Sequence, residues 1–263
     1  MDLGLNNLRA LVTGASKGLG YATALGLARE GVRVVINSRD QKTLSEAAKG
    51  ISSQTKSDVH ALAGDLTNPD VPAKVVAGAA ELLGGLDLLV TNTGGPPSGP
   101  FEDFDDEAWD RALDQVFSSH VRLIRAALPH LRQSRFASVL TITSISVKQP
   151  ISNLILSNAG RAATVGLTKT LALELGPEGI RFNSILPAST ETQRIYELLE
   201  QRAKDKSTSL EEEIAAQSEA SPLGRMAKPE EFANAAVFLL SPAASYITGV
   251  MLTVDGGMYK GTL

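Results

Sequence analysis

The stretch Thr13-Gly14-Ala15-Ser16-Lys17-Gly18-Leu19-Gly20 decides the fold. It follows an apolar run at 9–13 that is typical of a buried strand, and it opens a helical pattern over 18–31. Glycines at such a junction permit a tight turn and a close approach of the backbone to a ligand. The N-terminus of the helix adds free amides and partial positive charge, which favour a pyrophosphate. The stretch therefore predicts a strand, a dinucleotide-binding turn and a helix.

The alternation of strand and helix continues along the chain. Further strands are predicted at 32–36, 59–63, 86–90, 136–143, 182–186 and 250–254. Helices are predicted between them, at 41–50, 71–83, 106–131 and 153–175. Strict alternation favours a parallel sheet with right-handed crossovers. We expect a single doubly wound α/β Rossmann fold over 1–263, with seven parallel strands and helices on both faces.

Two segments depart from this alternation. Residues 94–100 contain three glycines and three prolines, which predicts a loop. Residues 190–220 are polar, rich in charge and helical in pattern, and they follow the sixth strand. In a doubly wound sheet both segments lie beyond the carboxyl ends of strands, where ligands bind. We interpret 190–220 as a lid, with a solvated pair of surface helices as the alternative.

The composition argues against several classes of function. The 263 residues carry 25 Lys plus Arg against 29 Asp plus Glu, and 43% are hydrophobic. No basic stripe is available for nucleic acid or an anionic membrane surface. Cysteine is absent, and His60, His120 and His130 lack metal-ligand spacing. Without a signal-peptide pattern or an apolar run of about 18 residues, we expect a cytoplasmic protein that acts on a small molecule.

The end of the second predicted strand, Asn37-Ser38-Arg39, indicates which nicotinamide cofactor binds. An acidic residue here would hydrogen-bond the adenosine ribose of NAD(H), whereas a basic residue would pair with the 2′-phosphate of NADP(H). Ser38 stands at the acidic position, and both Arg39 and Lys17 are placed to meet a phosphate. Asp40 is the feature that favours NAD(H) instead. The sequence therefore predicts NADP(H) in preference to NAD(H).

Asp65 and Leu66 follow the third predicted strand. Their place at the carboxyl end of that strand predicts contact with adenine. Asp65 has an alternative role, as the cap of a helix that begins near Asn68.

Over essentially its whole length the sequence resembles the short-chain dehydrogenase/reductase family, and within it the β-ketoacyl-acyl-carrier-protein reductases. The glycine motif at 13–20 carries the resemblance, as do the closing segments at 246–249 and 254–257. Asn92 and Gly94 match part of an asparagine-rich family motif, and Pro187 and Thr192 match residues that frame the nicotinamide. Together with the motifs above, the resemblance implies a cofactor site comprising Gly14, Ser16, Lys17, Gly18, Leu19, Gly20, Ser38, Arg39, Asp65, Leu66, Asn92, Gly94, Arg161, Pro187, Thr190 and Thr192.

The catalytic set of the family is an asparagine, a serine, a tyrosine and a lysine four residues after the tyrosine. Aligned by spacing, this sequence has Val116, Ser144, Ser157 and Arg161 at those positions, so only the serine is retained. The runs at 94–97 and 147–150 also resemble a divergent subgroup that lacks the usual set. The resemblance therefore implies a 3-oxoacyl-reductase-like protein with an atypical site.

Ser157 and Arg161 lie four residues apart and share a helix face. Arg161 retains the positive charge that would bind the nicotinamide ribose and stabilise an oxyanion, while Ser144 and Ser157 could orient a carbonyl. A serine hydroxyl is a far weaker acid than a tyrosine beside a lysine, so Lys148 or Tyr196 would have to supply the proton. The alternative roles are close helix packing at 157–160 and a structural ion pair for Arg161.

Three functions remain open from the sequence. The first is an NADP(H)-dependent oxidoreductase that acts on a carbonyl or hydroxyl substrate through Ser144, Ser157 and Arg161. The second is a catalytically weak or inactive nucleotide-binding homologue whose lid signals the state of the cofactor. The third is an enzyme of different chemistry, in which Ser144 and Arg161 bind an anionic substrate. The resemblance also implies a homodimer or homotetramer.

Overall fold

A seven-stranded parallel sheet forms the centre of the computed structural model, which describes residues 2–262. The strand order is β3-β2-β1-β4-β5-β6-β7, and every neighbouring pair is parallel. This confirms the predicted Rossmann fold, whose strand order reverses between β1 and β4 and so opens a crevice at their carboxyl ends. The strands are β1 (Arg9–Val12), β2 (Arg33–Ser38), β3 (Val59–Ala63), β4 (Leu88–Thr91), β5 (Ser138–Ile142), β6 (Arg181–Pro187) and β7 (Met251–Val254).

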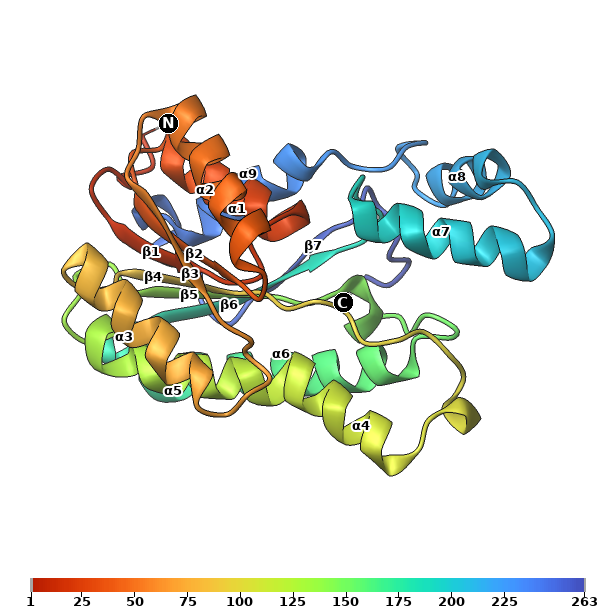
Figure 1. Cartoon of the computed structure of the whole chain (residues 1–263), viewed down its shortest axis with the longest axis horizontal. Coiled ribbons are helices and arrows are strands. Elements are labelled where there is room, and N and C mark those ends of the chain that lie inside the picture. The colour runs from red at the N-terminus through yellow and green to blue at the C-terminus, as the bar shows by residue number, and fades with distance from the viewer. Residues whose placement is uncertain (1, 263) are drawn as a thin grey trace.

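Helices cover both faces of the sheet, as Figure 1 shows. One face carries α1 (Gly18–Arg29), α2 (Gln41–Thr55) and α9 (Pro229–Leu240). The other carries α3 (Val71–Leu83), α5 (Ser119–Leu131) and α6 (Ile155–Leu175), with α4 (Asp106–Leu113) leading into α5. Two hydrophobic clusters lie on opposite faces: Val34 and Ile36 belong to one, and Val35 between them belongs to the other. Burial on both faces explains why the strands are continuous apolar runs.

The single helix predicted at 106–131 is interrupted, so that prediction was wrong in its continuity. A π-helical segment, Asp114–Ser118, separates α4 from α5. The side chain of Thr164 donates a hydrogen bond to the Val116 carbonyl oxygen over 2.6 Å. Gly160 permits this approach of α6, because a Cβ there would collide with the side chain of Val116. A π-helical turn leaves a backbone carbonyl without its regular helical hydrogen bond, and the Thr164 hydroxyl of α6 donates to this carbonyl.

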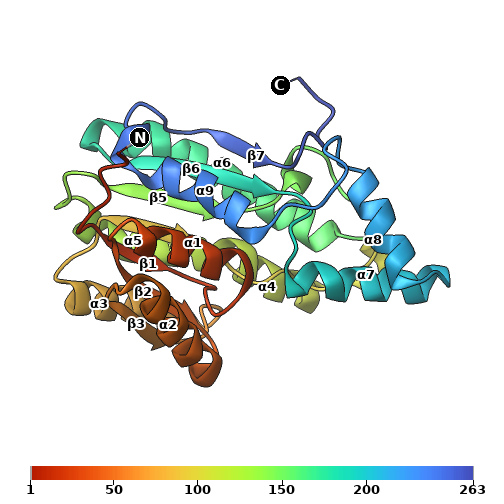
Figure 2. The same cartoon turned by 90° about the horizontal axis from the view of Figure 1, so that it is seen from above.

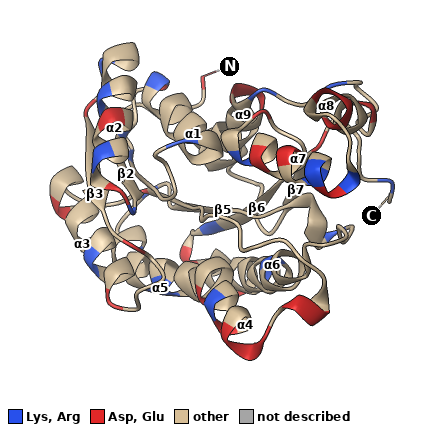
Figure 3. Cartoon of the chain, turned by 45° about the vertical axis from the view of Figure 1, so that its right-hand side comes forward, with Lys and Arg blue, Asp and Glu red and all other residues tan. Residues whose placement is uncertain are grey.

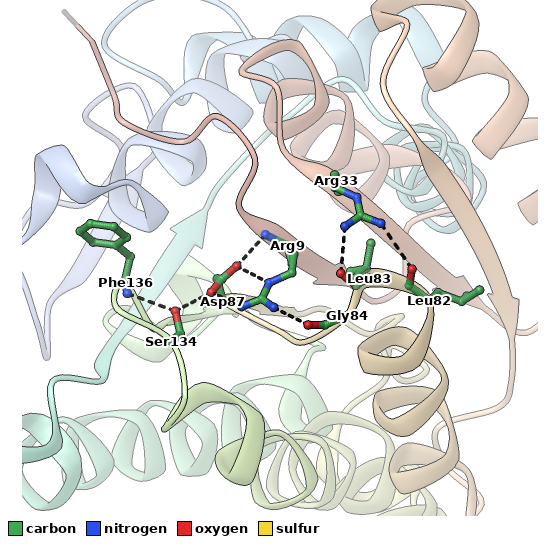
Figure 4. A network of polar contacts seen from close by, with 8 residues as sticks. All are labelled: Arg9, Arg33, Leu82, Leu83, Gly84, Asp87, Ser134 and Phe136. Atoms are coloured by element: carbon green, nitrogen blue, oxygen red, sulfur yellow. Dashed lines mark hydrogen bonds and ion pairs between the residues drawn. The ribbon is translucent and has the colours of Figure 1, made fainter.

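A polar network fixes the amino ends of β1 and β4 (Figure 4). The Arg9 side chain donates to both carboxylate oxygens of Asp87, over 2.8 and 2.9 Å, and the Arg9 backbone amide donates to the same carboxylate. The Ser134 hydroxyl also donates to the Asp87 carboxylate, over 2.6 Å. These bonds hold the pKa of Asp87 below its ordinary value, although burial acts in the opposite direction. The network lies at the edge of the sheet opposite to the crevice.

The segment predicted as a lid forms two helices, α7 (Gln193–Lys206) and α8 (Leu210–Glu219). They extend past the carboxyl ends of the strands in both views (Figures 1 and 2). Arg202 donates to Gln217 over 2.9 Å, which ties the two helices together, and Gln217 donates to Ser189 over 2.6 Å, which ties α8 to the end of β6. We call α7 and α8 the lid helices.

Lys and Arg are dispersed over the helices drawn in Figure 3, whereas Asp and Glu also gather in the stretch that leads into α4, at 102–107. Among the helices of residues 2–262, none is long and apolar enough to cross a membrane. The same residues contain no group of three or more His, Cys, Asp or Glu side chains that could hold a metal ion.

Candidate active site

The glycine turn joins β1 to α1 and is braced by the end of β4. Gly14 has a φ of +58°, and a Cβ there would lie 2.8 Å from the backbone oxygen of Asn92. Asn92 donates from its side chain to the Gly14 carbonyl oxygen over 3.0 Å, and the Thr13 hydroxyl donates to the Asn92 carbonyl oxygen over 2.8 Å. At Gly20 a Cβ would collide with the Gly14 carbonyl. Glycine is therefore required on steric grounds, and Asn92 acts here by holding the turn in shape.

The carboxyl edge of the sheet holds buried polar atoms that have no hydrogen-bond partner within the described residues. A buried hydroxyl without a partner costs about 1–3 kcal/mol, so a row of them is expected where a polar ligand completes the bonding. The row spans the ends of β2, β4, β5 and β6, which is the path of a dinucleotide in a doubly wound sheet. The residues present therefore fit a bound dinucleotide. The atoms are Asn37 Oδ1, Ser38 Oγ, Thr93 Oγ1, Thr143 Oγ1, Ser146 Oγ and Thr190 Oγ1.

The end of β2 places the residues predicted to select the cofactor. Ser38 has its side-chain oxygen buried, and Arg39 is exposed directly after it. The carboxylate of Asp40 caps α2 by accepting from the Thr43 amide over 2.8 Å and from the Thr43 hydroxyl over 2.7 Å. These bonds lower the pKa of Asp40. The acidic residue that favoured NAD(H) thus has a structural role in the helix cap.

The end of β3 corrects one interpretation. Asp65 accepts from the Thr67 amide over 3.0 Å and from the Thr67 hydroxyl over 2.8 Å, so it closes its own turn. The alternative that it caps a helix near Asn68 is wrong, because α3 begins at Val71. Leu66 is buried in the hydrophobic cluster under the sheet.

Ser157 and Arg161 lie together in the first turns of α6, against the end of β5. Arg161 is only 8% exposed, and its Nε donates to Ser157 Oγ over 3.1 Å. Its Nη1 donates to the carbonyl oxygens of Ile142 and Thr143, both over 3.3 Å. Within the described chain no carboxylate forms an ion pair with Arg161, and no partner is recorded for Nη2. The structural ion pair considered from the sequence is therefore not formed.

Ser144 lies two residues beyond β5 and begins a short 3₁₀ turn at Ile145–Val147. Its hydroxyl oxygen accepts from the Ser146 amide over 3.1 Å, and the residue is half-buried. Since the oxygen is the acceptor, the hydroxyl proton of Ser144 stays available to a ligand. The same holds for Ser157, whose oxygen accepts from Arg161.

His120 is a buried member of this region that the sequence argument assigned no role. It is fully buried on α5, with Nδ1 2.7 Å from the hydroxyl oxygen of Thr91 at the end of β4, and its Nε2 has no partner among the described residues. Burial, and to a smaller extent the charge of Arg161, lower the pKa of His120 to about 3. His120 is therefore neutral at neutral pH. Its position on the inner face of α5 was the available sequence signal.

The first turn of α7 bridges the crevice. Lys17 of the glycine turn donates to the side chain of Gln193 over 2.8 Å. The next residue, Arg194, donates in the other direction, to the Pro96 carbonyl oxygen over 3.3 Å, in the glycine- and proline-rich loop. Thr192 caps α7 and lies beside Gly18, where an added Cβ would sit 3.7 Å from its methyl group. Arg194 was missed by the sequence argument, although it stands only two residues after Thr192.

The two side chains considered as proton donors lie differently. The Lys148 ammonium lies over the ring of Tyr259, 5.1 Å from its centroid, and so faces the C-terminal segment. Tyr196 lies in α7, where its recorded hydrogen bond is that of its backbone amide to Thr192. Neither side chain has a recorded hydrogen bond to Ser144 or Ser157.

Burial lowers the pKa of Arg161 to about 10, and the nearby charge of Arg194 contributes to this. Arg161 therefore remains protonated at neutral pH. The site combines a glycine turn, two serine hydroxyls and a buried guanidinium at one edge of the sheet. Such a set can bind a dinucleotide, orient a carbonyl group and stabilise negative charge on its oxygen.

Comparisons with known proteins agree with this geometry. A family described as enoyl-(acyl carrier protein) reductase matches residues 14–259. Dehydrogenase/reductase SDR family member 4 of Oryctolagus cuniculus is 34% identical over 254 residues, which are 96% of this chain and 94% of that protein. NADPH-dependent reductase BacG of Bacillus subtilis (strain 168) is 31% identical over 255 residues, which are 95% of this chain and 97% of that protein.

Solved structures of reductases share the whole fold. L-sorbose reductase of Gluconobacter frateurii, in complex with NADPH and L-sorbose, has a TM-score of 0.94 and 32% sequence identity, and the match covers 99% of this chain and 100% of that one. An actinorhodin polyketide ketoreductase with NADPH has a TM-score of 0.92 and 28% identity, over 97% of this chain and 98% of that one. From its sequence, its sheet and its glycine turn, the chain belongs to the short-chain dehydrogenase/reductase family of oxidoreductases.

Proposed function

We propose that this chain is an NADPH-dependent reductase of small to medium carbonyl compounds, similar to 3-oxoacyl reductases, with Ser144, Ser157 and Arg161 as its catalytic residues. One observation carries the proposal. The Ser157–Arg161 pair is buried and hydrogen-bonded at the carboxyl end of β5, on the same edge of the sheet as the glycine turn. Thr143 Oγ1 and Ser146 Oγ, which follow β5, lack partners among the described residues.

The preference for NADPH rests on the end of β2. Arg39 is exposed and forms no recorded ion pair within the described residues, whereas the carboxylate of Asp40 is used as a helix cap. A guanidinium without a partner is suited to a 2′-phosphate. L-sorbose reductase and actinorhodin ketoreductase, both with NADPH in their structures, and the NADPH-dependent reductase BacG support the same choice. We assign Ser38 and Thr190, whose side-chain oxygens lack partners among the described residues, to the same cofactor site.

The catalytic roles follow from the hydrogen bonds. The chemistry that bound NADPH would supply is a hydride for the carbonyl carbon. Ser144 and Ser157 each have a hydroxyl proton to donate to the carbonyl oxygen, since their oxygens already accept from Ser146 and Arg161. Arg161 places positive charge beside the oxygen as it becomes an alkoxide. The proton that completes the alcohol comes from solvent through a serine hydroxyl.

This arrangement predicts slow turnover. A serine hydroxyl is a weak acid, and the loss of a positioned acid typically lowers a rate by about 10²–10⁴-fold. Lys148 does not fill the role in the described geometry, because its ammonium lies over Tyr259. The proposal therefore includes a low kcat together with ordinary cofactor affinity.

The decisive experiment combines binding with turnover. NADPH and NADH are titrated against the purified protein by calorimetry, and the absorbance of the nicotinamide is then followed with a panel of ketones, aldehydes and alcohols. We expect tighter binding of NADPH and slow, substrate-dependent oxidation that Ser144→Ala and Arg161→Met each reduce by at least about tenfold. Tighter binding of NADH, or no turnover across the panel, would contradict the proposal.

A nucleotide-binding protein without turnover is the second candidate, and one observation favours it. The first lid helix, α7, contacts both walls of the crevice, through Gln193 to Lys17 and through Arg194 to Pro96. A nucleotide that entered would meet these contacts, so its arrival would be transmitted to α7 and α8. Tight NADPH binding without oxidation, accompanied by altered proteolysis of 193–219, would favour this candidate.

We also propose a cytoplasmic homodimer or homotetramer, built from one domain over 1–263. Both hydrophobic clusters flank the same sheet, which supports a single domain. The outer face of α6 exposes Ala162, Gly166 and Leu173, the last 70% exposed, which supports an intersubunit contact. Light scattering tests the oligomer, and a purely monomeric protein would contradict it.

A further inference from the structure

Arg161 is a buried cation without an anion. Its side chain is more than nine-tenths buried, and its Nε and Nη1 use their hydrogen bonds on Ser157 and on the end of β5. No acidic side chain of the described residues pairs with it. A buried charge is costly unless an opposite charge accompanies it. The structure thus leaves an anionic partner to be supplied by a ligand.

A second guanidinium, that of Arg194, approaches from the lid. Its Nη2 donates to the Pro96 carbonyl oxygen over 3.3 Å, and a Cβ at Gly95 would lie 3.7 Å from the same nitrogen. Its charge contributes to lowering the pKa of Arg161. Arg194 also lacks an ion pair within the described chain. Two like charges near each other are destabilising until an anion joins them.

The cofactor phosphates belong on the other side of the crevice. They are expected at the glycine turn and the N-terminus of α1, and the lid residue that reaches this turn is Gln193, through Lys17. Successive helical residues point about 100° apart. Arg194, the next residue, donates to the Pro96 carbonyl oxygen instead, and its charge acts on Arg161.

The nearest acidic residue before Arg194 is turned elsewhere. Glu191 raises the pKa of Arg225, so its charge acts on that guanidinium, which itself pairs with Glu231. Glu191 therefore has a basic neighbour of its own in Arg225. The positive charge of Arg161 and Arg194 is left without a recorded acidic partner in the described chain.

From this geometry we propose that the substrate is an oxo acid, whose carboxylate is held by Arg194 and the Nη2 of Arg161 while its carbonyl lies against Ser144 and Ser157. The inference rests on the proposed function and specifies its substrate class. A guanidinium binds a carboxylate through two parallel hydrogen bonds, which would fix the position of the carbonyl. Reduction would convert the oxo acid and NADPH, with one proton from solvent, into a hydroxy acid and NADP⁺.

The kinetic test compares acids with neutral compounds of the same skeleton. The panel contains 2-oxobutanoate, 3-oxobutanoate and 4-oxopentanoate with their methyl esters. We expect at least one acid to exceed its ester in kcat/KM by about tenfold or more. Arg194→Gln should raise the KM of that acid by about tenfold or more, change the KM of the ester by less than about threefold, and leave the Kd of NADPH within about twofold. Arg194→Lys should recover part of the loss.

A binding test needs no turnover. Succinate, which has no carbonyl to reduce, is titrated by calorimetry into the protein saturated with NADP⁺. We expect its Kd to rise by about tenfold or more in Arg194→Gln. The matched control is Lys204→Gln, which removes one positive charge from an exposed position in the last turn of α7. The control should leave the binding of succinate and of NADPH unchanged.

The outcomes separate this inference from the proposed function. Failure of the unaltered protein to bind NADPH would overturn both. If the protein binds NADPH but reduces the esters as well as the acids, the assignment of an oxo acid substrate is overturned and the proposed function is not. The same follows if Arg194→Gln leaves the binding of succinate unchanged. If Arg194→Gln weakens the binding of NADPH and not that of succinate, the oxo acid assignment is also overturned, because Arg194 would then bind the cofactor.

Discussion

Acidification should destabilise this protein through His120 well before its paired carboxylates titrate. The imidazole has a pKa of about 3 in the fold, because it is buried and lies near the charge of Arg161. In the unfolded chain its pKa is about 6.5. The folded value is the lower one, so the unfolded chain binds the proton first. The stability contribution of neutral His120 is therefore complete above about pH 6.5 and is lost as the pH falls toward 3.

The size of this effect follows from the two pKa values. Between pH 7.5 and pH 5.0 the unfolded chain becomes protonated at His120 while the folded chain does not, which lowers the free energy of unfolding by about 2 kcal/mol. The carboxylates titrate in a lower range, because hydrogen bonds lower the pKa of Asp87 and bring that of Glu231 to about 2. Urea unfolding at both pH values, followed by far-ultraviolet circular dichroism at one protein concentration, measures the difference.

The variant His120→Gln isolates the contribution. Glutamine keeps a polar partner for Thr91 and cannot be protonated in this range, so the variant should lose about 2 kcal/mol less than the unaltered protein between the two pH values. The control His130→Gln changes a half-buried histidine near the end of α5 and should keep the pH dependence of the unaltered protein. Equal losses in His120→Gln and in the unaltered protein would refute the reasoning.

Three further predictions concern the amino edge, the helix crossing and the cofactor site. Asp87→Asn should lower the free energy of unfolding, measured in urea, by roughly 2 kcal/mol, because it breaks the charged hydrogen bonds from Arg9. The difference between the two proteins should shrink below about pH 4, because the lowered pKa of Asp87 means that its contribution is lost as the carboxylate becomes protonated. A difference that does not depend on pH would contradict this prediction. Gly160→Ala should cost about 1–3 kcal/mol by collision with Val116, and adding Val116→Ala should restore most of this; no recovery in the double variant would show that the collision is not the cause. Arg39→Ala should raise the Kd of NADPH by about tenfold or more and leave that of NADH within about twofold in calorimetric titrations, whereas equal weakening of both would remove Arg39 from the 2′-phosphate site.

The strands and most helices were predictable because each signal is local. Residues 59–63 and 71–83 were predicted with the bounds that the structure has, since apolar spacing reports which face of a segment is buried. The glycine turn was predictable for the same reason, as its steric demands act between near neighbours and the end of one strand. The interruption at Asp114–Ser118 was not, because it depends on how closely α6 packs against this segment.

The candidate site was predictable only in part. Ser144, Ser157 and Arg161 were found through spacing, and the structure brings Ser157 and Arg161 into contact. Whether they are catalytic, and whether they replace the tyrosine and lysine of the family, stays a prediction. Arg194 carried no local signal, and the signal of His120 was limited to its place on the inner face of α5, since the importance of both comes from what lies near them in the fold.

The amino-acid sequence by itself determined the parallel α/β sheet and the dinucleotide turn at 13–20, because helix and strand periodicity and glycine sterics act over a few residues. It also showed that position 38 carries a serine and not an acidic residue. Only the tertiary structure decided that Asp40 is used as a helix cap, that Arg161 is buried without an ion pair, and that Arg194 of the lid lies close enough to influence it. These last features depend on packing between distant segments, and burial is what turns an ordinary charge into one that requires a partner.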